Sequence, residues 1–171
     1  LLEWAEVAFE IIVKPVDETF PVGVKSTEAA MHIALKKANA VQEEVGEGRI
    51  IVAADTVVVL SEKIIGKTAD QQEAVQTLTQ LQGNTHEVVT GVAILKGKKQ
   101  VLFADVTEVT FNPLTPEQIL FYVEKYQPYD KAGAYAIQEW IGVVGIRSIK
   151  GDFYNVMGLP VNRVVQALAN I

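Results

Sequence analysis

The sequence contains no cysteine, which excludes disulfide scaffolds, cysteine-ligated zinc, iron–sulfur clusters and thiol nucleophiles. Long hydrophobic runs are also absent, because a run such as Ile50–Ala54 is far too short to span a membrane. No charged-then-apolar leader opens the chain. Positive charge is scarce too: 15 Lys and Arg stand against 21 Asp and Glu, a net charge of −6. A surface of that sign does not attract duplex nucleic acid or an anionic membrane.

The length and composition are those of one globular domain. The chain has 171 residues, of which 49% are hydrophobic and 21% charged, enough to bury a core without disulfides or metals. It opens at Leu1 without a methionine, inside a helical pattern, so we expect the natural N-terminus to be missing. We therefore expect a single soluble domain over residues 1–171, located in the cytoplasm.

Hydrophobic periodicity and capping signals predict an α/β fold with a mixed sheet flanked by helices. Ser26 is the predicted N-cap of one helix and Gly46 its C-cap signal. The predicted helices cover residues 1–9, 26–45, 71–81, 116–126 and 161–169. The β-rich runs are 9–13, 49–60, 86–95, 100–111 and 142–149, with a hairpin turn at 96–99.

Asp55 is the first candidate functional residue, because it interrupts a mostly apolar strand. A carboxylate buried there without a partner would cost several kcal/mol. It must therefore be paired, hydrogen-bonded, metal-bound or placed at the edge of a cavity. A structural explanation carries equal weight: Asp55 and Thr56 could close hydrogen bonds at a strand bend.

Further charged residues form weaker signals. Asp17 and Glu18 could hold a hard cation such as Mg²⁺, although such a pair is more often a solvated turn. Lys67 follows a strand and a glycine, where it could meet a phosphate, although an exposed loop lysine is the commoner explanation. Lys37 lies on the flank of the helix predicted over 26–45.

The segment Lys131–Gln138 is rich in small residues. Glycine and alanine let the backbone approach a ligand, and the Gln138 amide suits the edge of a base. Tight helix-to-sheet packing explains the same residues without a ligand. The turn Asn155–Pro160 can likewise be architectural, and His86 is more often a structural histidine than a metal ligand. Carboxylates with lysines, including Lys131, suit metal-assisted chemistry on a phosphorylated substrate.

Taken together, these segments resemble the Maf family of nucleoside triphosphate pyrophosphatases, also called septum-formation proteins. Each motif is weak alone, but their order is the family's order and covers nearly the whole chain. The matching stretches are Asp17-Glu18, Ala34–Ala38, Ala54–Val58, Gly66-Lys67, Leu81–Thr90, Thr107–Phe111, Lys131–Gln138 and Tyr154–Pro160.

The resemblance implies hydrolysis of a nucleoside triphosphate to its monophosphate and pyrophosphate, with Mg²⁺ or Mn²⁺ as cofactor. It also implies a twisted sheet with helices in two lobes around a central cleft, and a homodimer. The family's catalytic aspartate falls on Asp55, and its acidic metal site on Glu18 together with Asp55. Its phosphate-facing lysines fall on Lys37 and Lys67. Water attack on the α-phosphorus fits this set, whether Asp55 removes the proton or carries the metal.

The resemblance also bears on substrate choice. The family branch acting on dTTP and UTP carries a segment similar to Lys131–Gln138, with its specificity residues on Thr56 and Gln138. The alternatives are the 7-methyl-GTP branch and a non-catalytic, nucleotide-binding regulator of septum formation. The chain departs from the family in lacking the N-terminal strand and its Ser-x-Ser-Pro-Arg-Arg loop. It also has Thr68 where the family has proline and Ala136 where glycine is common.

Overall fold

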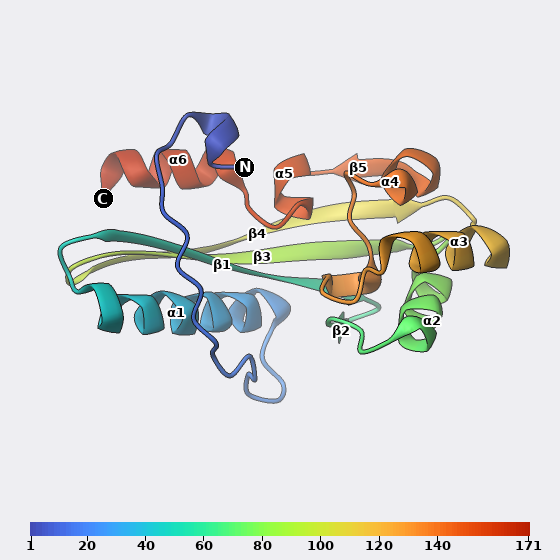
Figure 1. Ribbon diagram of the computed structural model, residues 1–171, viewed down its shortest axis with the longest axis horizontal. Helices are drawn as coiled ribbons and strands as arrows, with labels where there is room; N and C mark the ends of the chain where they lie inside the picture. The colour runs from blue at the N-terminus through green and yellow to red at the C-terminus, as the bar shows by residue number, and fades with distance from the viewer. The chain divides into compact units, whose positions relative to one another are not determined.

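The computed structural model describes residues 1–171 and confirms the α/β class, a sheet flanked by helices (Figure 1). The strands lie in the order β2-β1-β3-β4-β5, and β1–β2 and β4–β5 pair antiparallel. The strands are β1 Ile50–Leu60, β2 Lys63–Ile65, β3 Thr85–Lys96, β4 Lys99–Phe111 and β5 Ile146–Lys150. The helices are α1 Ser26–Val45, α2 Gln71–Leu81, α3 Pro116–Tyr126, α4 Trp140–Gly145, α5 Phe153–Val156 and α6 Val161–Asn170, with 3₁₀ turns η1 Glu3–Ala5 and η2 Ala132–Ala134. None of these helices has the length and apolar character needed to cross a membrane.

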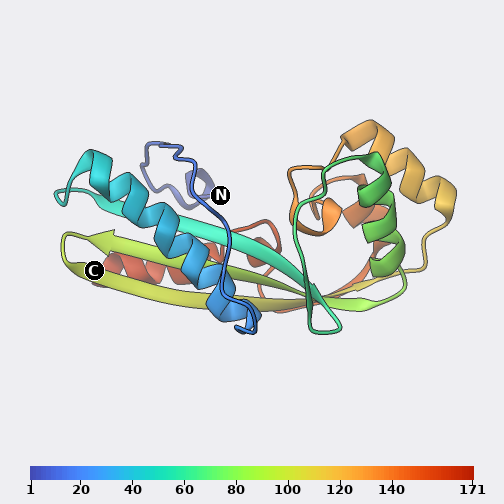
Figure 2. The same ribbon diagram turned by 90° about the horizontal axis from the view of Figure 1, so that it is seen from below.

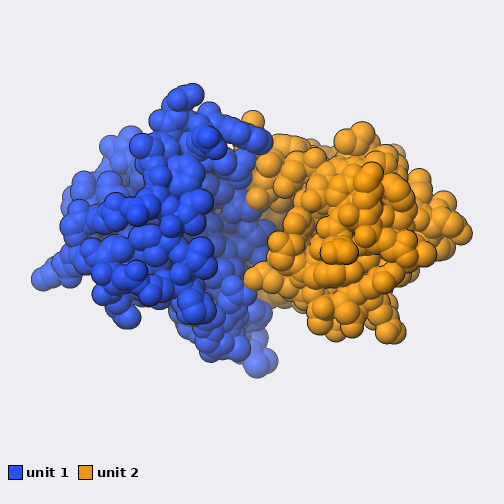
Figure 3. Space-filling model, in the orientation of Figure 1, with its two compact units in different colours: residues 1–56, 89–105, 158–171 blue, residues 57–88, 106–157 orange.

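The chain divides into two compact units, coloured separately in Figure 3. The first unit contains residues 1–56, 89–105 and 158–171. The second contains residues 57–88 and 106–157. Strands β1, β3 and β4 each contribute residues to both units, so neither unit is a continuous stretch of sequence.

In the first unit, helices cover both faces of the strands, because alternate strand residues point to opposite sides. Helix α1 packs on a cluster of small and aliphatic side chains that includes Ile51, Ala93 and Leu95. Helix α6 packs on the alternate residues, among them Val92 and Ile94. Figures 1 and 2 show α1 and α6 on opposite faces of these strands.

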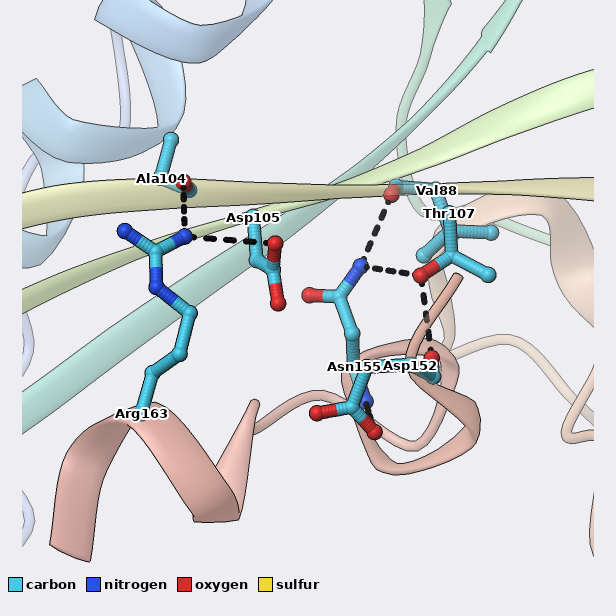
Figure 4. Close-up of polar contacts among 7 residues, drawn as sticks. All are labelled: Val88, Ala104, Asp105, Thr107, Asp152, Asn155 and Arg163. Carbon is cyan, nitrogen blue, oxygen red and sulfur yellow. Dashed lines mark hydrogen bonds and ion pairs between the residues drawn. The ribbon is translucent and has the colours of Figure 1, made fainter. Parts of the chain in front are cut away.

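An arginine ties α6 to β4 in the first unit. Arg163 Nη1 donates to the Ala104 carbonyl oxygen at 2.7 Å and pairs with Asp105 Oδ1 at 3.2 Å. Its guanidinium also lies over the Phe103 ring, 4.4 Å from the centroid. Figure 4 draws the two polar contacts. The arginine fixes α6 along the strand through directional bonds as well as apolar packing.

The second unit has a core of its own, in which α2 and α3 lie side by side (Figures 1 and 2). Sequence signals predict both helix starts correctly. Asp70 caps α2 by accepting from the Glu73 backbone N–H. Thr115 and Gln118 form a reciprocal capping box at the start of α3, as the spacing predicts.

The N-terminal predictions are partly wrong. The helix expected over residues 1–9 is only the short turn η1, because Glu6 adopts a left-handed φ of 54° and ends it. The β-rich run 9–13 belongs to no strand, because β propensity makes a strand only where a neighbour takes up the backbone hydrogen bonds. Ser26 is the first helical residue rather than the cap, whereas Gly46 is the C-cap as predicted.

The strand expected over 142–149 is also partly wrong. Its first half is the end of α4, and only β5 from Ile146 onward is extended. The reason lies in the turn before it: the Gly142 backbone N–H donates to the Glu139 carbonyl oxygen, and a Cβ at Gly142 would lie 1.7 Å from the Ile137 carbonyl oxygen. This close packing outweighs the β propensity of Val143 and Val144.

Candidate functional site

The first unit brings three predicted site residues together around one ammonium group. Lys37 Nζ, on α1, lies 2.6 Å from Asp55 Oδ1 on β1. The same nitrogen lies 2.8 Å from Glu18 Oε1 in the N-terminal loop. The Asp55 side chain is 11% exposed and that of Glu18 is 41% exposed. A partly buried lysine therefore joins a carboxylate with little exposed surface to one that water readily reaches.

The ion pairs set the charge state of this cluster. Burial alone would lower the pKa of Lys37, but the hydrogen bonds to Asp55 and Glu18 outweigh it, so the pKa is raised. Lys37 is therefore cationic over the physiological range. Because the folded-state pKa is raised, the stabilising effect is complete below the lysine's ordinary pKa and is lost only as the pH rises through the folded value.

The N-terminal loop presents Glu18 through local bonds of its neighbours. Asp17 accepts from the Thr19 backbone N–H at 3.0 Å and from the Thr19 hydroxyl. These bonds, the side-chain one first, lower the pKa of Asp17. Lys36 Nζ donates to the carbonyl oxygens of Asp17 and Thr19, both at 3.2 Å. Asp17 and Lys36 thus hold the loop, whereas Glu18 and Lys37 belong to the Asp55 cluster.

Thr56 follows Asp55 on β1, and its hydroxyl lies 2.8 Å from the hydroxyl of Thr90 on β3. A Cβ on Gly158 would lie 3.6 Å from Thr56 Oγ1. Thr56 thus has the kind of structural partner considered for this pair, since its hydrogen bond links two strands. For Asp55, the ion pair with Lys37 supplies the partner that a carboxylate in a strand requires.

The second unit holds the other predicted residues. Lys131 Nζ pairs with Asp130 at 3.0 Å, and this hydrogen bond lowers the pKa of Asp130, with a smaller contribution from Lys67. The backbone N–H of Gly133 donates to the Gly66 carbonyl oxygen at 3.1 Å. The loop after β2, which carries Lys67, and the segment carrying Lys131 are therefore neighbours. Asp130 is not among the residues predicted from the sequence, although a carboxylate next to a candidate lysine is a usable signal.

Residues 133–137 are buried, whereas Gln138 is exposed. Gly133 adopts a φ of 71°, and a Cβ there would come within 2.8 Å of the Val58 side chain, so packing requires glycine at this position. Ala134 has a left-handed φ of 56°, but Ala136 does not share it. The alanine at 136 is therefore free of the backbone strain that would have made glycine necessary.

His86 supports this segment from β3. Its Nε2 lies 2.8 Å from the Tyr135 hydroxyl, and the two rings pack edge to face. Burial raises the pKa of Tyr135 and lowers that of His86 to about 4. His86 is thus a structural histidine, as the sequence indicates.

Because His86 is buried, the free energy of unfolding depends on pH in the acidic range. Between about pH 6.5 and pH 4 the unfolded chain binds a proton at His86 that the folded chain does not, so stability falls as the pH falls. We expect His86→Gln to remove this dependence, worth about 3 kcal/mol over that range. Urea midpoints at pH 7 and pH 4.5 measure it. His32→Gln, on the exposed face of α1, is the matched control. If the urea midpoint of His86→Gln fell between pH 7 and pH 4.5 as much as that of the wild type, His86 would not be the group responsible.

The motif Tyr154–Pro160 contains a fully buried asparagine. Asn155 Nδ2 donates to the Val88 carbonyl oxygen and to Thr107 Oγ1, both at 3.0 Å (Figure 4). Thr107 in turn donates to the Asp152 carbonyl oxygen at 2.9 Å, and Asp152 caps α5. This network joins α5 to β3 and β4 within the second unit, which is the architectural role that the sequence left open.

Comparison with known proteins gives the family. The model of the family described as Maf-like protein matches residues 1–171. The chain belongs to the Maf family. This confirms the resemblance that the ordered motifs indicate.

Curated relatives of this Maf-family chain carry an activity in their names. A dTTP/UTP pyrophosphatase from Cytophaga hutchinsonii is 46% identical over 98% of the chain and 77% of the relative. One from Bacillus cereus is 45% identical over 98% of the chain and 87% of the relative. One from Parabacteroides distasonis is 41% identical over 98% of the chain and 88% of the relative.

Proposed function

We propose that this chain is a nucleoside triphosphate pyrophosphatase that hydrolyses dTTP and UTP to the monophosphate and pyrophosphate. The observation that carries the proposal is the cluster of Asp55, Lys37 and Glu18, which sets a little-exposed carboxylate beside a cation and an accessible carboxylate. Relatives that share 41–46% identity and are named dTTP/UTP pyrophosphatases support it. The wider activity includes modified pyrimidine nucleoside triphosphates.

In the proposed reaction, water attacks the α-phosphorus and the bond from that phosphorus to the bridging oxygen breaks, releasing pyrophosphate. Asp55 activates the water, either by taking its proton or by holding the cation that acidifies it. Lys37 holds Asp55 in position, and its ammonium group can also bind the negatively charged oxygens of the triphosphate. Lys67 and Lys131 supply further cations for the phosphates.

The carboxylate pair also fits a divalent cation. Glu18 and Asp55 already converge on one positive group, the Lys37 ammonium, and Mg²⁺ is commonly bound by one or two carboxylates together with substrate phosphates. The chain presents no group of three or more acidic, His or Cys side chains arranged for a metal, so substrate oxygens and water would complete such a site. When bound, Mg²⁺ or Mn²⁺ would neutralise charge on the phosphates and acidify the water.

Base selection is assigned to Gln138 and Thr56. A glutamine amide can donate to O4 and accept from N3–H of uracil or thymine. The exposed position of Gln138 beside a buried segment suits this role. We assign no nucleic-acid or membrane partner, consistent with the net charge of −6; the proposed enzyme is a cytoplasmic homodimer.

The test is pyrophosphate release by the full-length protein from dTTP, UTP, CTP, GTP and 7-methyl-GTP with Mg²⁺. We expect dTTP and UTP to be hydrolysed with kcat/KM at least about tenfold above CTP. Release from 7-methyl-GTP alone would overturn the substrate assignment and keep the enzyme class. Binding of dTTP without release of pyrophosphate from any nucleotide would indicate the regulator instead.

A further inference from the structure

An amide alone does not separate uracil from cytosine. Uracil presents the O4 acceptor and the N3–H donor, whereas cytosine presents the N4 amino donor and the N3 acceptor. A glutamine amide turned by half a rotation exchanges its donor and acceptor, so a freely turning Gln138 would read either base. Discrimination therefore requires a device that fixes how Gln138 is presented.

Tyr122 of α3, which has no exposed surface, contacts the residues on both sides of Gln138. Its hydroxyl donates to Glu139 Oε2 and accepts from the Ala136 backbone N–H at 3.1 Å. These two partners lie on either side of Gln138 in the sequence. One buried hydroxyl thus holds both flanks of the exposed glutamine.

Neighbouring contacts confirm that this turn is tightly held. The Glu139 backbone N–H donates to the Ala136 carbonyl oxygen at 3.1 Å, closing the turn on itself. Gly142 lies so close to the Ile137 carbonyl oxygen that no side chain fits between them. Phe121, next to Tyr122 on α3, packs edge to face on Trp140 with ring centroids 5.0 Å apart.

The Tyr122 hydroxyl stays protonated and can therefore always donate a hydrogen bond. Burial, followed by the hydrogen bond to Glu139, raises the pKa of Tyr122. The hydroxyl therefore keeps its proton and can donate at every physiological pH. Because the hydroxyl oxygen donates to Glu139 and also accepts from the Ala136 backbone N–H, one atom holds both residues.

We propose that Tyr122 is a positioning residue for base selection: by holding Ala136 and Glu139, it fixes the turn that presents Gln138 and so favours uracil and thymine over cytosine. This rests on the proposed function, in which Gln138 contacts the base. Tyr122 and Glu139 are not among the residues predicted from the sequence, because the bond that joins them runs from one element to another. Nothing in the spacing of Tyr122 indicates it.

The test compares kcat/KM for UTP with that for CTP, and the dissociation constants of their α,β-methylene analogues, in the full-length protein. Gln138→Ala is measured first and should lower the UTP-to-CTP ratio about tenfold or more. Tyr122→Phe should lower the ratio in the same direction, mainly through KM for UTP. In the Gln138→Ala background, Tyr122→Phe should change the ratio no further.

Controls separate positioning from general damage. Tyr126→Phe, one turn along α3 with its ring stacked on Tyr122, should keep the wild-type ratio. Glu139→Ala removes one of the two contacts at the edge of the core and should lower the ratio even where Tyr122→Phe does not fold. If both Tyr122→Phe and Glu139→Ala keep the wild-type UTP-to-CTP ratio, the inference is overturned and the proposed function stands. The same holds if Tyr122→Phe lowers the ratio in the Gln138→Ala background by as much as it does in the wild type. A wild-type ratio in Gln138→Ala overturns the proposed role of Gln138 and the inference with it.

Discussion

Replacing Asp55 by asparagine should lower pyrophosphate release from dTTP by about 10²- to 10⁴-fold. The amide keeps the size of the side chain but removes the negative charge, and with it the ability to take a proton or hold a cation. Lys37 retains Glu18 as a partner at 2.8 Å, so the cluster should stay assembled. We therefore expect the dissociation constant of a non-hydrolysable dTTP analogue to change far less than kcat.

The matched control is Glu10→Gln, which also removes a carboxylate from the first unit. The Glu10 side chain is 64% exposed and pairs with Arg49 rather than with Lys37, so its loss should leave turnover near the wild-type value. Both variants are compared by initial rates of pyrophosphate release at saturating dTTP. Unchanged turnover in Asp55→Asn would mean that the reaction does not use this carboxylate.

Local signals predict most of the fold because the chemistry that makes them is local. The capping residues Asp70 and Thr115 mark their helix starts in sequence and in structure. The predictions fail where propensity is overruled, as at Gly142, whose close packing against the nearby Ile137 accompanies a helix end in a run with β propensity. The run 9–13 fails for another reason, because no neighbouring strand takes up its backbone hydrogen bonds.

The candidate site follows the same rule. A carboxylate in an apolar strand must have a partner, so the sequence identifies Asp55, and the ordered family motifs identify Lys37 and Glu18. The distances that join them come from the packing of α1 against β1 and from the loop before α1. No pattern along the chain specifies these distances.

Replacing Gly91 by alanine should destabilise the protein by about 3 kcal/mol or more, at the upper end of the usual cost of overpacking. A Cβ at Gly91 would lie 2.3 Å from both the Ala30 carbonyl carbon and the Met31 backbone nitrogen of α1. Backbone atoms in the middle of a helix cannot turn aside, so α1 must move away from β3. Its contact face is built of small residues such as Ala34 and Ala38, both without exposed surface, which indicates that close approach of the helix is part of the fold.

The displacement should also reach the candidate site, since α1 carries Lys37 and the 2.6 Å contact with Asp55 depends on where the helix lies. Urea unfolding measures the loss of stability, and dTTP turnover under conditions where the variant remains folded measures the effect on the site. Gly48→Ala is the control: no heavy atom lies within 4 Å of a Cβ there, so we expect a change within about 0.5 kcal/mol. If Gly91→Ala unfolded at the wild-type urea midpoint, α1 would not be held at this distance from β3, and the geometry joining Lys37 to Asp55 would lose its support.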